Sequence, residues 1–188
     1  MLGRLTRALD RAGRAGALPR GLPLFLTEFG IQSTPDPIAG VSLAKQAEFQ
    51  AMAERIAVRN PRVRTFSQYL LRDSDPVPNA PPLARYPGFE SGLRFSDGRA
   101  KPALAAFPVP LSARRAGRTA VLWGLARPAR RRTTVTLLYA DRGQRFRKLR
   151  TVRTDSRGAF TTRTRYRTGR RWRLRWTSFT GPPIRAYR

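Results

Sequence analysis

The stretch LPLFLTEFG, residues Leu22–Gly30, is an apolar run that ends at a carboxylate, Glu28, with a glycine two residues later. A strand that is apolar along its length is usually buried on both faces, as in a parallel sheet. A charged side chain fits only at the end of such a strand, where the sheet opens to solvent or to a ligand. The sequence therefore predicts a buried strand here, with Glu28 at its carboxyl end.

The segments around this strand alternate in type over the first 110 residues. Leu2, Leu5 and Leu9 have the spacing of an amphipathic helix, and residues 42–58 predict a second helix with Ser42 as its N-cap. VRTFSQYLL, residues 63–71, predicts a second strand. A Pro- and Asp-rich loop follows, and then a short helix with Pro102 in its first turn. This order is typical of a parallel α/β fold.

The composition excludes several classes of site. The chain has 188 residues and contains neither cysteine nor histidine. Disulfides, thiolate metal sites and Ser-His or Cys-His catalysis are therefore excluded, and we predict no metal and no cofactor. No apolar run reaches the roughly 20 residues that a membrane-spanning helix needs.

The positive charge is concentrated in the last part of the chain. Residues 1–110 carry 15 Lys and Arg against 9 Asp and Glu, whereas residues 111–188 carry 23 against 2. The composition changes within the connection PVPLSARRAG. We therefore predict two domains, residues 1–110 and residues 111–188.

Residues 111–188 have the pattern of a small all-β domain. Phe160, Thr162 and Thr164 alternate with threonine and arginine, and Trp172 and Leu174 alternate with arginines. A period of two is typical of strands with one buried and one wet face. Short turns such as DSRG separate the runs. The region therefore predicts an antiparallel β-sandwich, Ig-like in general shape, with Trp123, Trp172 and Trp176 in its core.

The first region resembles the last quarter of a barrel enzyme. LFLTEFG, the helix after it, RVRTFSQYLL and GLRFSDGRAKPALAAF together resemble the cellulase-like retaining glycoside hydrolases, a clan of (β/α)8 barrels. The resemblance implies a fold class of α/β plus all-β: the C-terminal fragment of a (β/α)8 barrel, with strands seven and eight and their helices, followed by the β-sandwich.

The same resemblance implies a role for Glu28. In this clan the nucleophile is a glutamate at the carboxyl end of strand seven, often within a "TE-aromatic-G" sequence, and Glu28 matches that position. Gln68 and Tyr69, near the end of the next strand, would line the substrate cleft. Retaining hydrolysis needs a second carboxyl group about 5–5.5 Å away. The clan's Asn-Glu motif for that group does not occur in this sequence. The other candidate acids lie in loops: Asp36, Asp73, Asp75 and Glu90.

The function that follows is a part of a retaining glycoside hydrolase acting on O-glycosidic bonds of a polysaccharide. Because the acid/base glutamate is missing, we expect residues 1–188 alone to be inactive, as a truncated gene or a misplaced start would produce. Residues 111–188 also resemble the small β-domains appended to secreted actinobacterial hydrolases. An extracellular or wall-associated parent protein is therefore expected, although the sequence shows no signal peptide.

Two alternatives stay open. Glu28 could be a strand-terminal carboxylate paired with one of the many arginines. The chain could also be a non-catalytic basic protein that binds anionic polymers, such as cell wall, acidic polysaccharide or nucleic acid. No pattern for specific nucleic-acid recognition is present, and 35 of the 38 basic residues are arginine, as GC-rich coding would produce.

Overall fold

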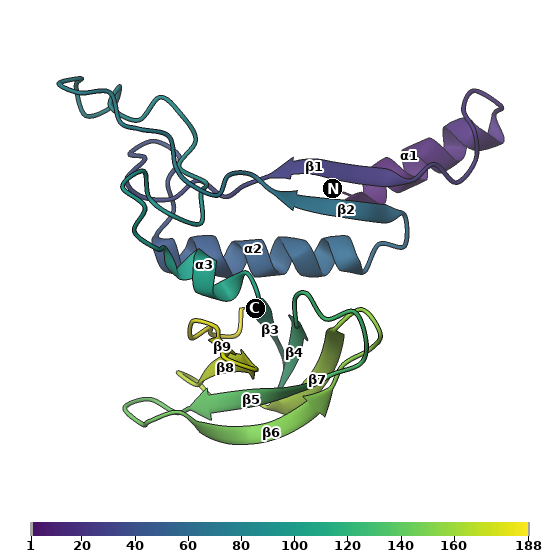
Figure 1. The fold of residues 1–188 in the computed structure, drawn as a ribbon. Coiled ribbons are helices and arrows are strands. Elements are labelled where there is room, and N and C mark those ends of the chain that lie inside the picture. The colour runs from purple at the N-terminus through teal and green to yellow at the C-terminus, as the bar shows by residue number, and fades with distance from the viewer. Residues whose placement is uncertain (1, 188) are drawn as a thin grey trace.

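One long helix lies between a pair of strands and two larger sheets (Figure 1). The computed structural model describes residues 2–187. The first part of the chain contains α1 (Leu2–Arg14), β1 (Leu24–Phe29), α2 (Leu43–Val58), β2 (Val63–Gln68) and α3 (Pro102–Ala106). The second part contains β3 (Leu111–Ala116), β4 (Thr119–Leu125), β5 (Thr134–Ala140), β6 (Arg147–Arg153), β7 (Ala159–Arg165), β8 (Arg171–Trp176) and β9 (Phe179–Thr180).

The strands β1 and β2 are parallel neighbours joined by α2. Their register places Leu26 beside Phe66 and Phe29 beside Gln68. The helix begins at the predicted cap, where Ser42 Oγ accepts the backbone N–H of Lys45 at 3.4 Å. The predicted positions of both strands and of this helix are therefore confirmed.

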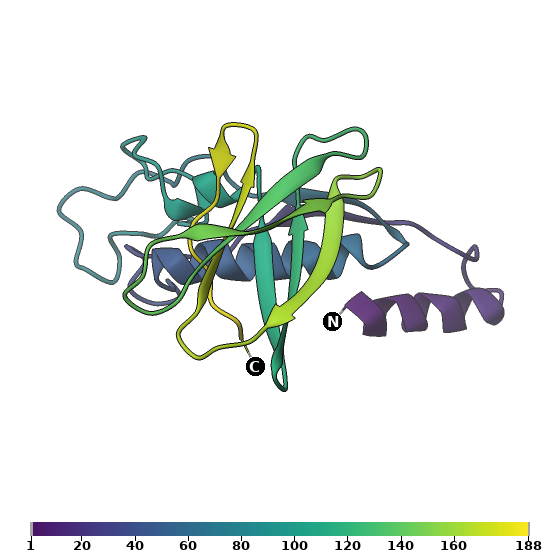
Figure 2. The same ribbon diagram turned by 90° about the horizontal axis from the view of Figure 1, so that it is seen from below.

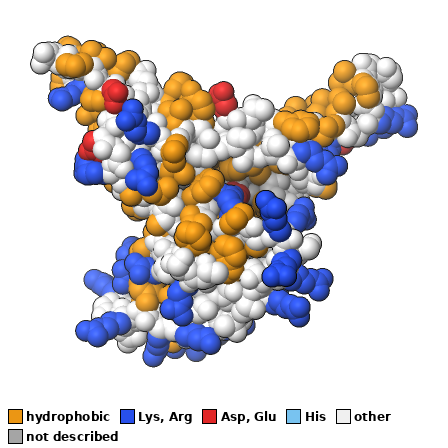
Figure 3. Space-filling model, viewed as in Figure 1, with side chains coloured by type: hydrophobic (Ala, Val, Ile, Leu, Met, Phe, Trp, Pro, Cys, Tyr) orange, Lys and Arg blue, Asp and Glu red, His pale blue; other side chains and the backbone are white. Residues whose placement is uncertain are grey.

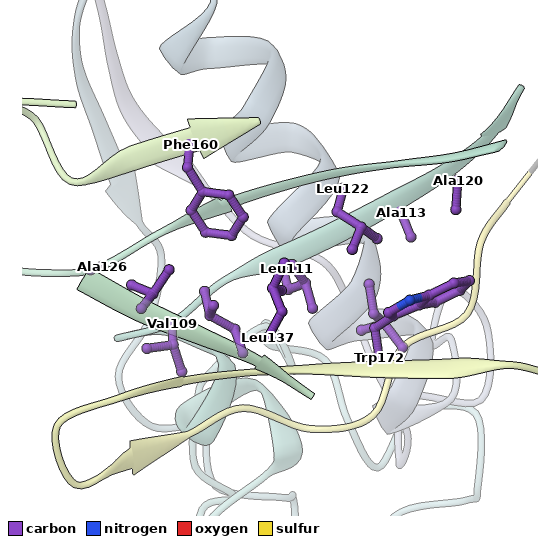
Figure 4. Packing of buried hydrophobic residues seen from close by; sticks show 12 residues of the cluster. Val109, Leu111, Ala113, Ala120, Leu122, Ala126, Leu137, Phe160 and Trp172 are labelled. Carbon is purple, nitrogen blue, oxygen red and sulfur yellow. The ribbon is translucent and has the colours of Figure 1, made fainter. Parts of the chain in front are cut away.

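The two larger sheets enclose an apolar core. Their strand orders are β3-β4-β7 and β6-β5-β8-β9, and every pairing is antiparallel. Leu122 from one sheet and Leu137 and Trp172 from the other are fully buried in a common cluster (Figure 4). Trp123 is also buried, and Trp176 is half-buried, with its Nε1 donating to Thr133 Oγ1 at 3.0 Å.

The predicted fold class of α/β plus all-β, with a fragment of a (β/α)8 barrel, is wrong. The protein is mainly β, with three small sheets and 18% helix, and it lacks the repeated β/α alternation of a barrel. The strand–helix–strand unit β1–α2–β2 occurs once and does not continue. Residues 69–101 contain no helix or strand of the three sheets, and α3 has only five residues. The unit β1–α2–β2 lies where the sequence predicts it, but the rest of the chain does not form the barrel that this unit suggested.

The helix α2 connects the strand pair to the larger sheets. It contacts β3 and β4 as well as α3 and β2. Arg127, which follows β4, forms an ion pair with Glu54 of α2, and Arg55 Nη1 donates to the hydroxyl of Tyr187 at 3.1 Å. The division at residues 110 and 111 stays a prediction, although β3 begins at Leu111.

The helix α1 projects to one side of the molecule, as both ribbon views show (Figures 1 and 2). Arg62 Nη1 lies 2.6 Å from Asp10 Oδ1 and ties this helix to the segment before β2. Within residues 2–187, no helix combines the length and apolar character needed to cross a bilayer.

Candidate functional site

The carboxyl edge of the β1–β2 pair carries the backbone positions of the predicted site residues. Because parallel strands end on the same side, Glu28 in β1 and Gln68 in β2 reach the same edge. The backbone N–H of Tyr69 donates to the carbonyl oxygen of Phe29 at 2.9 Å and extends the pairing by one residue. Glu28 is exposed, and no Lys or Arg among residues 2–187 forms an ion pair with it.

Gly30 is required by the close packing beside Glu28. A Cβ atom at this position would lie 2.5 Å from the Cβ of Ser91 and 2.6 Å from the carbonyl oxygen of Tyr69. Ser91 Oγ in turn donates to that carbonyl oxygen at 2.6 Å. The glycine of the TEFG sequence therefore lets the segment around Ser91 pack directly against the edge.

Gln68 holds the loops of this edge in place. Its Nε2 donates to the carbonyl oxygens of Tyr69 at 2.9 Å and Ser91 at 2.8 Å, and its Oε1 accepts from Gln50 Nε2 of α2. Both ends of the Gln68 amide are therefore occupied by protein groups. The half-buried ring of Tyr69 packs edge-on against Phe89, with ring centroids 5.4 Å apart.

A buried polar cluster lies behind the edge and joins three loops. Lys101 Nζ donates to Ser33 Oγ at 2.9 Å, to Asp73 Oδ1 at 2.8 Å and to the carbonyl oxygen of Glu90 at 3.0 Å. Asp73 Oδ1 also accepts the backbone N–H of Gly92 at 2.8 Å. The side chains of Lys101 and Asp73 are 0% and 1% exposed, so the ion pair is almost completely shielded from water. All three donors of the ammonium group are used, which identifies Lys101 as a structural anchor of the site.

Glu90 is the carboxyl group of this cluster whose ionisation is most perturbed. Burial, together with the hydrogen bond and negative charge of Asp73, raises the pKa of Glu90 from 4.5 to about 7. The positive charge of Lys101 acts in the opposite direction, and the charge of Asp36 acts in the same direction as Asp73. The site therefore favours the neutral form of the Glu90 carboxyl group well above the pH at which a free glutamate ionises.

Two of the loop acids, Asp36 and Asp73, are already engaged within the protein. Asp73 pairs with Lys101, and Asp36 Oδ1 accepts the backbone N–H groups of Ile38 and Ala39 at 2.8 and 3.1 Å. Asp36, Asp73 and Glu90 are all buried, whereas Asp75 is exposed with Arg72 4.0 Å away. Among residues 2–187, no group of His, Cys, Asp or Glu is arranged to hold a metal ion.

Sequence reasoning placed Asp73 and Glu90 in a cleft-lining loop and missed Lys101. The partners of Lys101 are 11, 28 and 68 positions away along the chain, so no local pattern connects them. One signal was available. Lysine occurs at only three positions in this arginine-rich chain, and Lys101 directly precedes the apolar residues PALAAF that contain α3. Lysine is a compact, strongly hydrated cation, so its use where arginine is the rule singles this position out.

Comparison with known proteins leaves the family of this chain open. No known family and no curated protein matches the sequence. Two solved structures of β-glucuronidases, which are glycoside hydrolases, resemble it. One is Bacteroides uniformis β-glucuronidase 2 covalently bound to cyclophellitol-6-carboxylate aziridine, with 12% identity and a TM-score of 0.40. The other is Bacteroides uniformis β-glucuronidase, with 11% identity and a TM-score of 0.38. Each match covers 98% of this chain and 24% of the enzyme, so the chain spans about a quarter of their length. We draw no conclusion about fold or activity from similarity this low.

Proposed function

We propose that the carboxyl edge of the β1–β2 pair contacts a sugar and that Glu28 is the nucleophile position of a retaining glycoside hydrolase acting on a polysaccharide. The observation that supports this proposal is an exposed carboxylate at a strand end with no cationic partner among residues 2–187. Gly30, Ser91 and Gln68 fix the backbone around it through close packing and hydrogen bonds. Tyr69 would present its ring to the sugar, and Gln68 would act by positioning the loop that carries Tyr69.

The chemistry assigned to Glu28 is attack on an anomeric carbon. One carboxylate oxygen forms a bond to that carbon while the bond to the leaving oxygen breaks, and the leaving group departs with the electron pair. An ordinary alcohol leaving group needs a proton from a second carboxyl group. Because Asp36 and Asp73 are engaged elsewhere and Glu90 is buried, we expect no turnover of a polysaccharide by these residues alone. An extracellular parent protein is part of the same proposal.

Nucleophilic attack by Glu28 can be tested without the missing acid, by a probe whose leaving group needs no proton. Incubation with 2,4-dinitrophenyl 2-deoxy-2-fluoroglucoside should release dinitrophenolate once and leave one sugar on the chain. Intact-mass and peptide mass spectrometry should place that sugar on Glu28. Glu28→Gln should abolish labelling, whereas Glu48→Gln, a half-buried glutamate on α2, should retain it. An unlabelled but folded protein, or a label that persists in Glu28→Gln, contradicts the proposal.

A second candidate function is the binding of anionic polymers by the β3–β9 region, as in the small Ig-like modules that its sequence resembles. Both acidic residues of this region already have partners within the protein. Asp141 pairs with Arg170 at 2.6 Å, and Asp155 Oδ1 accepts the backbone N–H groups of Arg157 and Ala159 at 2.9 Å. Blue side chains accordingly follow the outline of this region in Figure 3, and the red ones in that view lie higher.

Anion binding of this kind has a characteristic salt dependence. Each neutralised charge releases counterions, so affinity for an acidic polysaccharide should fall linearly on a log–log plot against salt concentration. Titration of the whole chain with polygalacturonate between low and physiological salt measures this slope. A flat slope, or equal affinity for a neutral polysaccharide, contradicts the second candidate.

A further inference from the structure

Four arginines surround one hollow between the end of α2 and the larger sheets. The hollow has a volume of about 770 Å³, and we call it the arginine hollow. Arg59 is the C-cap of α2, Arg132 lies in the β4–β5 loop, Arg153 ends β6, and Arg157 lies in the β6–β7 turn. Three separate segments of the chain, with Arg59, with Arg132 and with Arg153 and Arg157, therefore contribute guanidinium groups to the same space.

The positive charge of the arginine hollow is not neutralised from within the protein. None of the four arginines forms an ion pair within residues 2–187. Asp155 is the one acidic residue that lines the hollow, and its Oδ1 accepts the backbone N–H groups of Arg157 and Ala159. The carboxyl end of α2 adds about half a negative charge, which leaves the lining strongly cationic. Like charges gathered in this way favour a multivalent anion between them.

The backbone that carries these arginines is held in place on every side. The Thr133 and Thr154 segments exchange two hydrogen bonds, of 2.9 and 3.0 Å, which fix the positions of the neighbouring Arg132 and Arg153. The β6–β7 turn is closed by Asp155 and by Gly158, whose φ of +82° and tight packing against Ala126 exclude a side chain. Val58 packs on Trp123 and anchors Arg59 beside it. Such preorganisation lowers the entropic cost of binding.

The floor of the hollow distinguishes between classes of anionic polymer. Its two aromatic residues, Trp123 and Phe160, are only 3% and 6% exposed, so neither offers a face for a nucleobase to stack on. Guanidinium forks match carboxylates with paired hydrogen bonds, and the hydroxyl of Thr161 can bond to a sugar. The volume is within the range of small-ligand sites.

We propose that the arginine hollow is a binding site for an acidic oligosaccharide, whose carboxylates pair with Arg132, Arg153 and Arg157 above an apolar floor. This inference rests on the second candidate function and assigns it a location and a ligand. It is independent of the role proposed for Glu28, which lies at the carboxyl edge of β1–β2.

The test compares two triple variants that lose the same charge. Arg132→Ala/Arg153→Ala/Arg157→Ala removes the proposed contacts, and Arg142→Ala/Arg145→Ala/Arg150→Ala removes three exposed, unpaired arginines outside the hollow. Calorimetric titration of the full chain with a galacturonic acid tetrasaccharide should give a Kd that rises at least about tenfold in the first variant. The second variant should change it by less than about threefold. Maltotetraose, which is neutral, should not bind.

Each outcome either supports or overturns the assignment. Equal losses of affinity in the two triple variants would overturn the arginine hollow as the binding site, while general anion binding by the protein would stand. Absence of tetrasaccharide binding by the unaltered chain would overturn both the arginine hollow as a binding site and the second candidate function. Tighter, hollow-dependent binding of a thymidine oligonucleotide would overturn the ligand class. Should the hollow variant fail to fold, arginine modification of the unaltered chain provides the measurement. Saturating tetrasaccharide should protect Arg132, Arg153 and Arg157 from phenylglyoxal more than Arg142, and equal protection contradicts the site.

Discussion

The two parts of this protein are held together by different interactions. Residues 111–187 enclose an apolar cluster between two sheets, and Leu122, Leu137 and Leu174 are fully buried in it. Residues 2–110 have a much smaller apolar cluster around Ala47 and Leu93, and a buried ion pair joins their loops. Among residues 2–187, every large hydrophobic side chain that is exposed lies in this first part, except Phe179.

In this chain, the positions of the helices and strands and the stability of the fold therefore have separate origins. In the β-rich part, one apolar face of β5 and of β8 both locates the strand and stabilises it. In the first part, the strands β1 and β2 form at the predicted positions, but the predicted burial of β1 is wrong, since only Leu24 is buried and Phe25 is 58% exposed. The loops at the carboxyl edge depend on directional polar contacts instead, and these fail abruptly when one partner is removed.

The largest effect expected from this comparison follows from removing Lys101. Lys101→Met leaves the carboxylate of Asp73 buried without a cation, and we expect a loss of about 3–5 kcal/mol in the free energy of unfolding. Urea unfolding measures the loss, and hydrogen exchange should locate it in residues 24–107 rather than in β3–β9.

A second substitution should recover part of this loss. Lys101→Met combined with Asp73→Asn removes the stranded charge, whereas Lys148→Met, at an exposed lysine on β6, should be neutral. A loss below about 1 kcal/mol for Lys101→Met would show that the polar cluster does not hold the first part together.

A somewhat smaller effect is expected from the apolar core of the β-rich part. Leu137→Ala creates a cavity at a fully buried position, and we expect it to cost about 2–5 kcal/mol, centred near 3. Hydrogen exchange should accelerate first in β4, β5 and β8. Leu83→Ala, at an exposed leucine of the first part, is the matched control and should change stability by less than about 0.5 kcal/mol. Equal effects of the two substitutions would remove the distinction between the parts.

The smallest effect is a pH dependence confined to the first part. The pKa of Glu90 is raised to about 7, so the folded protein favours the neutral carboxyl group, whereas the unfolded chain ionises it above 4.5. The stability due to this group is therefore complete below about pH 4.5 and is lost as the pH rises through 7. Urea unfolding at pH 5, 6, 7 and 8 should show this decline.

The matched variant for the pH experiment is Glu90→Gln. It keeps the shape of the side chain and removes its titration, so its stability should vary less over the same pH range than that of the unaltered chain. Parallel curves for the two proteins would exclude Glu90 as the titrating group, whose neighbours in the cluster are Asp73, Lys101 and Asp36.

Local patterns in the sequence predicted the elements but not their architecture. The apolar run at Leu22–Gly30 and the cap at Ser42 located β1 and α2, and the alternation from Phe160 onward correctly separated buried from exposed positions. The fold class was wrong because one strand–helix–strand unit does not specify how many units follow. Residues 69–101 instead make irregular loops that pack through Ser91, Gly92 and Lys101.

The candidate sites show the same limit. Glu28 could be singled out because a carboxylate directly after an apolar run is unusual, and its proposed role is still to be tested. The arginine hollow could not be found in this way, since its arginines come from three segments and resemble the many other arginines of the chain. Only their common position around one hollow distinguishes them.

By itself, the sequence determined where chain segments become helices and strands, which faces of β7 and β8 turn inward, and how unevenly charge is distributed. These properties depend on neighbours a few residues apart. The tertiary structure alone decided that the protein is mainly β, that Lys101 is buried against Asp73, and that four arginines share one hollow. Burial and electrostatic pairing depend on distance in space, and residues that are far apart in the chain become neighbours only after folding.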